Sequence, residues 1–290
     1  MKKSRKLATL GICSALFLGL AACQQQHATS EGTNQRQSSS AKVPWKASYT
    51  NLNNQVSTEE VKSLLSAHLD PNSVDAFFNL VNDYNTIVGS TGLSGDFTSF
   101  THTEYDVEKI SHLWNQKKGD FVGTNCRINS YCLLKNSVNI PKLEKNDQLL
   151  FLDNDAIDKG KVFDSQDKEE FDILFSRVPT EATTDVKVHA EKMETFFSQF
   201  QFNEKARMLS VVLHDNLDGE YLFVGHVGVL VPADDGFLFV EKLTFEEPYQ
   251  AIKFASKEDC YKYLGTKYAD YTGEGLAKPF IMDNDKWVKL

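Results

Sequence analysis

Three residues far apart in the chain, Cys126, His226 and Glu241, have side chains that together could carry nucleophilic chemistry. A glycine and two polar residues at positions 123–125 precede the cysteine, and this order predicts that a helix begins there. The unpaired N–H groups and the dipole of a first helical turn stabilise a thiolate. We therefore expect Cys126 to be a nucleophile whose backbone N–H can also serve an oxyanion hole. The alternative is a small buried core residue.

The two residues that flank this cysteine extend the candidate site. Arg127 adds positive charge beside the thiol, which favours the thiolate. Asn125 is either the cap of the predicted helix or a polar partner of the oxyanion. We take both as candidates for substrate or oxyanion contacts. Two other cysteines, Cys132 and Cys260, stand in apolar helical patterns and are expected to pack in the core.

His226 interrupts an apolar run and has a glycine on each side, at 225 and 228, as a strand that faces a ligand requires. A Pro-Ala-Asp-Asp-Gly turn joins this run to a second one at 237–245, which predicts a hairpin. Pairing of Pro232 with Phe237 would place His226 and Glu241 on one face as diagonal neighbours, about 7–8 Å apart. Glu241 could then accept one imidazole N–H and fix the tautomer. The alternatives are a core histidine bonded to a carbonyl and an exposed strand glutamate.

The first 22 residues have the pattern of a bacterial export signal. A basic start precedes an apolar stretch at 7–20, which is shorter than the roughly 20 residues of a membrane span. The stretch ends in Leu-Ala-Ala-Cys, which resembles the bacterial lipobox. This resemblance implies cleavage before Cys23, lipid on its sulfur, and anchorage at the extracellular face of the cell membrane. An ordinary signal peptide is the alternative.

The polar segment 23–43 predicts a flexible tether, and residues 44–290 are expected to form a single domain. Removal of the four basic residues in the signal would leave 27 basic residues against 40 acidic ones, a net charge of −13. This acidic balance argues against a nucleic-acid partner. Five cysteines are too few for a disulfide scaffold. Because no metal-ligand, phosphate-loop or dinucleotide motif is present, we expect no metal or cofactor.

Helical patterns precede strand patterns along the predicted domain. Apolar residues recur at helical spacing over 57–69, 73–84, 103–118 and 185–200, and a further helix follows Ser256. The spacing at Ser57 predicts a capping box. Strand patterns cover 209–245, and the acidic residues at 153–158 are expected to form a solvated turn. Helices followed by an antiparallel sheet predict an α+β fold.

A cysteine at a helix start, then a strand histidine, then a polar residue on the next strand resembles the papain-like cysteine peptidase superfamily. The likeness is nearer to its bacterial cell-wall branch of NlpC-type peptidases and amidases, in which the histidine commonly precedes Val-Gly, as it does here. It covers Thr124–Leu134 and Val224–Phe245. The chain after Cys23 also resembles an uncharacterised family of Gram-positive lipoproteins marked by Asn-Cys-Arg, here residues 125–127, which brings no established activity.

The first resemblance implies a papain-like α+β fold, with Cys126 as nucleophile, His226 as general base and Glu241 as the orienting group. Together with the expected membrane anchor, it implies peptidoglycan stem peptides as substrates. The chain departs from the pattern in its glutamate, in its long gap between cysteine and histidine, and in lacking a clear glutamine ahead of Cys126. A non-catalytic binding or adhesion lipoprotein on the same fold and a transglutaminase-like amide transfer remain as alternatives.

Overall fold

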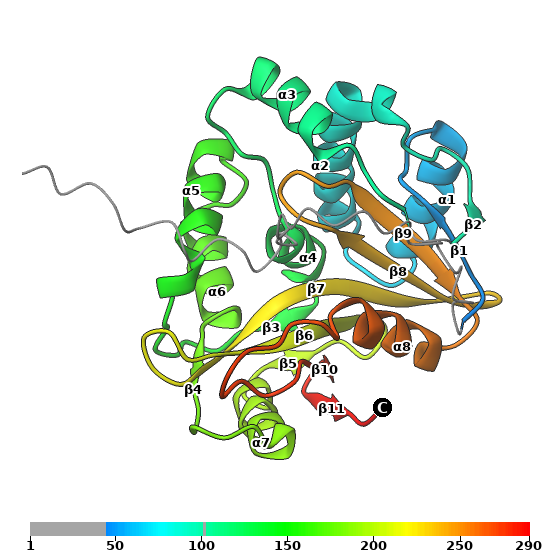
Figure 1. Ribbon diagram of the computed structural model, residues 1–290. Helices are drawn as coiled ribbons and strands as arrows, with labels where there is room; N and C mark the ends of the chain where they lie inside the picture. Colours follow the sequence, from blue (N-terminus) through cyan, green and yellow to red (C-terminus); the bar gives the residue numbers. More distant parts are fainter. Residues whose placement is uncertain (1–44, 101–102) are drawn as a thin grey trace, which may run out of the picture. The chain divides into compact units, whose positions relative to one another are not determined.

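The computed structural model describes residues 45–100 and 103–290, and these residues belong to one compact unit (Figure 1). The expected signal peptide, Cys23 and the expected tether all lie outside the described residues. Within the described part, no helix is long and apolar enough to cross a membrane.

The unit is built on a nine-stranded sheet whose paired neighbours run antiparallel, in the order β11-β10-β6-β7-β8-β9-β1-β2 with β4 paired to β7. A separate pair is formed by β3 and β5. The strands are β1 Ala47–Thr50, β2 Thr98–Ser99, β3 Val138–Asn139, β4 Val178–Pro179, β5 Gln201–Phe202, β6 Arg207–Asp215, β7 Tyr221–Ala233, β8 Gly236–Lys242, β9 Tyr249–Phe254, β10 Phe280–Asp283 and β11 Lys286–Val288.

Helices cover the sheet, so the α+β class expected from the sequence is confirmed. They are α1 Gln55–Ser66, α2 Pro71–Val88, α3 Val107–Lys118, α4 Cys126–Leu134, α5 Phe151–Gly160, α6 Ser165–Leu174, α7 Val186–Phe197 and α8 Lys257–Lys267. On one face α4 packs against β7 and β8, and on the other α8 packs against β8, β9 and β10 (Figure 1). Each face has its own apolar core, because side chains alternate along each strand.

Several helices begin at residues other than those expected from the sequence. Asn54 caps α1, Asp70 caps α2 and Asp106 caps α3, each accepting a backbone N–H three residues later. The expected capping box at Ser57 is therefore wrong: Ser57 donates its N–H to Asn54 instead. A carboxylate or amide three residues upstream of the periodic pattern can cap as well as a hydroxyl. The helix expected over 185–200 is α7, which begins one residue later with Asp185 as its cap, and Ser256 caps the helix expected after it.

The hairpin formed by β7 and β8 has the expected register, with Pro232 paired to Phe237. A β-bulge interrupts the pairing of β6 with β7, because Gly225 has no partner opposite it. A Cβ at Gly225 would lie 2.2 Å from Leu213 Cδ1, so only glycine fits this position. After the bulge, side chains again alternate between the two faces of the sheet, and this places His226 on the face covered by α8.

The structure corrects two further expectations. Strand β1 comes before the helices in the chain, yet it pairs with β9 inside the sheet, so the order is not helices first and sheet last. The acidic residues at 153–158 lie in α5 and do not form a solvated turn, and Asp153 is fully buried. The helix is hard to recognise from the sequence, because one of its buried positions holds the charged side chain of Asp153, where an apolar residue would be expected.

Candidate active site

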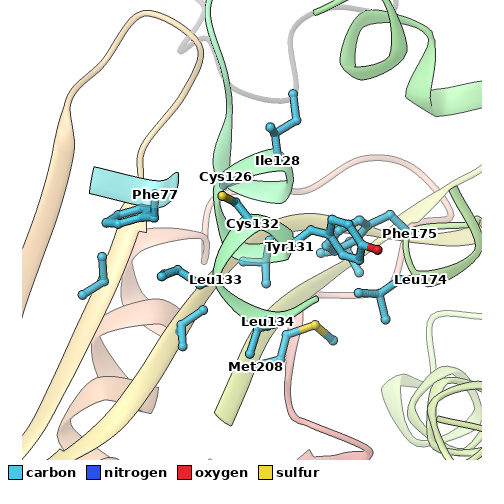
Figure 2. Close-up of a cluster of buried hydrophobic side chains, with 14 of the residues drawn as sticks. Phe77, Cys126, Ile128, Tyr131, Cys132, Leu133, Leu134, Leu174, Phe175 and Met208 are labelled. Atoms are coloured by element: carbon cyan, nitrogen blue, oxygen red, sulfur yellow. The ribbon is translucent and has the colours of Figure 1, made fainter. Parts of the chain in front are cut away.

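Helix α4 presents Cys126 as its first residue, at the place where the chain enters the core (Figure 2). Asn125 Oδ1 caps the helix by accepting the N–H of Ile128 at 3.1 Å. Gly123, two residues earlier, has φ +90°, a left-handed conformation that glycine adopts without strain. The side chain of Cys126 is buried, with the residue 3% exposed. As the sequence predicted, the thiol stands in a first helical turn.

The flanking side chains of the Asn-Cys-Arg motif bind one buried carboxylate. Arg127 contacts Asp153 through two hydrogen bonds, Nε to Oδ1 at 2.9 Å and Nη2 to Oδ2 at 2.7 Å. Asn125 Nδ2 donates to the same Oδ1 at 2.7 Å. Arg127 Nη1 also donates to Val224 O on β7, at 2.9 Å. These contacts position α4 against α5 and β7, and the expected contact of Asn125 and Arg127 with substrate or oxyanion stays a prediction.

A second polar group holds the chain on the other side of the cysteine. Asn129 Nδ2 donates to Thr124 Oγ1 at 2.9 Å and to Asn125 O at 2.8 Å. The hydroxyl of Tyr249, from β9, donates to Asn129 Oδ1 at 3.0 Å. All four residues are buried. Sequence reasoning missed this group, because Tyr249 is 120 residues away from its partner.

His226 connects the cysteine to the glutamate. Its ring is fully buried and its Nε2 lies 2.5 Å from Glu241 Oε2. Its Nδ1 has no hydrogen-bond partner among the described residues, and Cys126 is close enough to the ring to raise its pKa. Burial lowers the pKa of His226, but Cys126 and Glu241 outweigh this effect and raise the pKa overall. The structure thus brings together the three residues singled out in the sequence.

Glu241 is held by residues that sequence reasoning did not find. The hydroxyl of Tyr263 donates to its Oε1, and Lys267 Nζ lies 3.6 Å from the same oxygen. Although burial raises the pKa of Glu241, Lys267, His226 and Tyr263 together hold it below its usual range. Tyr268 stacks on the His226 ring with centroids 5.0 Å apart. The spacing of Tyr263 and Lys267 indicates a shared helix face, but no sequence signal says which strand it meets.

Lys242, the next residue on β8, is a buried cation near the site. Its Nζ donates to the backbone carbonyls of Thr244 at 2.7 Å and Phe245 at 3.1 Å, and to that of Glu247. The Tyr84 ring lies 4.3 Å from Nζ. Burial lowers the pKa of Lys242 to about 7. This lysine ties the loop after β8 to the core.

Two further cysteines and two further histidines lie in the core of the described part of the chain. Cys132 is buried in α4, where burial raises its pKa to about 12 (Figure 2), and Cys260 is fully buried in α8. His189 is fully buried. His214, whose ring centroid is 4.4 Å from that of His189, bonds Glu220 at 2.7 Å. In the described part of the chain, no group of three or more His, Cys, Asp or Glu residues could hold a metal ion.

A family model described as a domain of unknown function, DUF4300, matches residues 48–288. The chain belongs to this family. The match spans every helix and strand that contributes to the candidate site of this DUF4300 protein. No curated protein and no solved structure matches the chain. The description of DUF4300 names no activity, so the function has to be argued from the site itself.

Proposed function

We propose that this DUF4300 protein is a cysteine hydrolase that cleaves an amide bond. The observation that carries the proposal is the state of the His226 ring. Its Nε2 is bound to Glu241, its Nδ1 is buried without a hydrogen-bond partner among the described residues, and Cys126 raises the pKa of the same ring. A nucleophile, a base and a group that orients the base are the parts of a catalytic triad, recognised by geometry and not by position in the sequence.

In the proposed reaction, His226 Nδ1 takes the proton from the Cys126 thiol. The sulfur attacks the amide carbonyl, a C–S bond forms, and a negative charge develops on the carbonyl oxygen. His226 then gives its proton to the leaving nitrogen as the C–N bond breaks, which releases an amine and leaves a thioester on Cys126. Water activated by the same imidazole hydrolyses the thioester to a carboxylic acid and restores the thiol.

Two features of the chain would stabilise the charges in this reaction. The N–H of Cys126 lies in the first turn of α4, where no carbonyl of a preceding turn is available to it. It can donate to the oxyanion, and the helix dipole favours the negative charge. Glu241 stabilises the imidazolium that forms when His226 takes the proton.

The proposal also includes a relationship to papain-like peptidases, a membrane anchor and a class of substrate. The arrangement of cysteine helix, histidine strand and adjacent glutamate strand supports a papain-like relationship. The lipobox-like start supports lipid attachment at Cys23 and anchorage outside the cell membrane. An enzyme held there would meet peptidoglycan stem peptides, which we propose as its substrates.

The test is turnover of muropeptides by the purified full chain, compared with the Cys126→Ala variant. A Cys132→Ala variant is the matched control, because Cys132 is a buried thiol on the same helix. Release of new amino and carboxyl groups by wild type and Cys132→Ala, but not by Cys126→Ala, supports the proposal. Equal turnover by all three chains, or none, refutes it. An added primary amine that appears in the product indicates the transglutaminase-like transfer instead.

One observation favours a second candidate, a binding lipoprotein without catalysis. Cys126 is 3% exposed, Glu241 1% and His226 0%, so a substrate reaches the sulfur only if a covering group moves. The rate of thiol alkylation distinguishes the two candidates. A catalytic Cys126 reacts with iodoacetamide in the native protein faster than a free model thiol at pH 7, whereas a structural one reacts only on unfolding.

A further inference from the structure

Lys242 is a buried cation whose charge the mechanism above does not use. The residue is 1% exposed, and its Nζ donates to the backbone carbonyls of Thr244, Phe245 and Glu247. An ammonium has three N–H donors, so these carbonyls use all of them and none is left for a carboxylate. The neutral amine has only two donors and would leave one carbonyl unpaired. The hydrogen bonds therefore favour the charged form.

Keeping a charge at this position has a cost. Burial lowers the pKa of Lys242 to about 7, although the charges of Glu246, Glu247 and Cys126 act in the opposite direction. The two glutamates are at least partly exposed, so water screens them, whereas Cys126 is buried. Neutral donors can hold backbone carbonyls with much less desolvation. Anchoring of the loop therefore does not by itself explain a lysine here, and a buried anion beside it would explain one.

The lysine lies beside the segment that leads into the cysteine helix. Phe245 O, which accepts from Nζ at 3.1 Å, would also lie 3.4 Å from a Cβ at Gly123. Tyr249 is opposite Lys242 on β9, with its ring 5.3 Å from Nζ and its hydroxyl 3.4 Å from Thr124 Oγ1. Helix α4 also packs against β8. Two groups in contact with the ammonium thus hold the backbone immediately before the nucleophile.

Lys242 and Glu241 are neighbours on β8 and so face opposite sides of the sheet. Glu241 bonds Tyr263 in the core under α8. Lys242 lies against the Tyr84 ring in the core under α4, which also contains Cys126. The positive end of the α4 dipole repels the ammonium and attracts a thiolate in the first turn. A negative charge on the cysteine would therefore be stabilised by the helix and by the lysine together.

We propose that Lys242 is a positioning residue of the candidate site, whose ammonium stabilises the Cys126 thiolate and holds the loop 243–248 against the segment before the cysteine. The inference rests on the proposed function, since it gives Lys242 a part in forming the nucleophile of that reaction. It adds to the triad a second cation, which reaches the thiol from the sheet face opposite to that of Glu241.

The pH dependence of Cys126 alkylation by iodoacetamide in the full chain tests this role. The sulfur displaces iodide, and the rate follows the thiolate. A nearby opposite charge shifts a titration by about one to three pH units, so Lys242→Met should raise the midpoint of the rate profile by at least about one unit. Lys242→Arg keeps the charge and should restore the midpoint, whereas a loosened loop alone changes the maximal rate and not the midpoint.

The matched control is Lys135→Met, which removes a lysine at the other end of the same helix. It should leave the midpoint unchanged. A midpoint that Lys242→Met does not move, or that Lys135→Met moves equally, overturns the proposal.

A second measurement observes the lysine in chains that keep it. Coupling is reciprocal, so a thiolate that Lys242 stabilises raises the pKa of Lys242 by the same amount. The titration of the Lys242 side chain is followed by NMR of ¹³Cε-labelled lysine, with Lys242→Arg used for assignment. We expect a lower midpoint in Cys126→Ala than in wild type and an unchanged one in Cys132→Ala. Equal midpoints in all three chains overturn the proposal.

This measurement also separates the inference from the proposed function. A lower Lys242 midpoint in Cys126→Ala supports the charge coupling even if the wild type turns over no muropeptide, a result that refutes the hydrolase. Turnover by wild type together with equal midpoints refutes the role of Lys242 and leaves the hydrolase supported.

Discussion

Replacing Glu241 with glutamine tests the central contact of the site. The glutamine keeps the size of the side chain and can still accept the His226 N–H, but it removes the negative charge that faces the ring at 2.5 Å. A hydrogen bond to a charged group contributes about 1.5–3 kcal/mol. Since about 1.4 kcal/mol corresponds to a factor of ten, the population of the imidazolium–thiolate pair should fall roughly ten- to a hundredfold.

The assay is the rate of Cys126 alkylation by iodoacetamide at pH 7, followed by mass spectrometry of the peptide that contains Cys126. Only the thiolate reacts, so the rate reports its population. We expect Glu241→Gln to lower the rate roughly ten- to a hundredfold, and His226→Gln to lower it at least as much.

The structure offers a matched control in Glu220→Gln. Glu220 binds another buried histidine, His214, at 2.7 Å. This substitution removes the same kind of charge from a histidine that is not part of the candidate site. The reasoning is refuted if Glu241→Gln leaves the alkylation rate unchanged while the protein stays folded, or if Glu220→Gln slows it equally.

Three further results are expected. Asp153→Ala should lower the free energy of unfolding by about 3–5 kcal/mol in a urea titration, because it removes the carboxylate that pairs with the Arg127 guanidinium. A loss below about 1 kcal/mol would contradict the role given to Asp153. Burial lowers the pKa of His189, so on acidification the unfolded chain takes up a proton near pH 6.5 before the folded chain does. The free energy of unfolding should therefore decline as the pH falls below 6.5, by at most about 1.4 kcal/mol per pH unit. His189→Gln should reduce this slope. Lys242→Met should speed amide hydrogen exchange in residues 243–247 about tenfold or more, since it removes the shared donor of three carbonyls. Unchanged exchange would show that the loop does not depend on Lys242.

The sequence predicts those parts of the protein that depend on local chemistry. The glycine and polar residues before Cys126 predict its helix start, and the turn after Pro232 predicts the register that brings His226 and Glu241 together. Both predictions use rules that operate over a few residues, namely capping and the alternation of a hairpin.

The parts that the sequence did not predict depend on contacts between distant segments. Asp153 reads as one acidic residue of a surface turn until Arg127, 26 positions earlier, is placed beside it. Tyr263 belongs to a helix whose existence is predictable, but its contact with Glu241 depends on which way that helix packs. Strand β1 is only four residues long, too short for its pattern to show that it joins the sheet.

The buried pairing of Arg127 with Asp153 changes how the chain can be divided. Residues 136–208 separate the cysteine helix from the histidine strand and look like a removable insertion, yet they carry the carboxylate on which that helix rests. A shortened version that joined α4 directly to β6 would lose this carboxylate. The smallest fragment that keeps Cys126 in its position therefore includes α5. The Asn-Cys-Arg motif acts together with Asp153, so the physical motif has four residues.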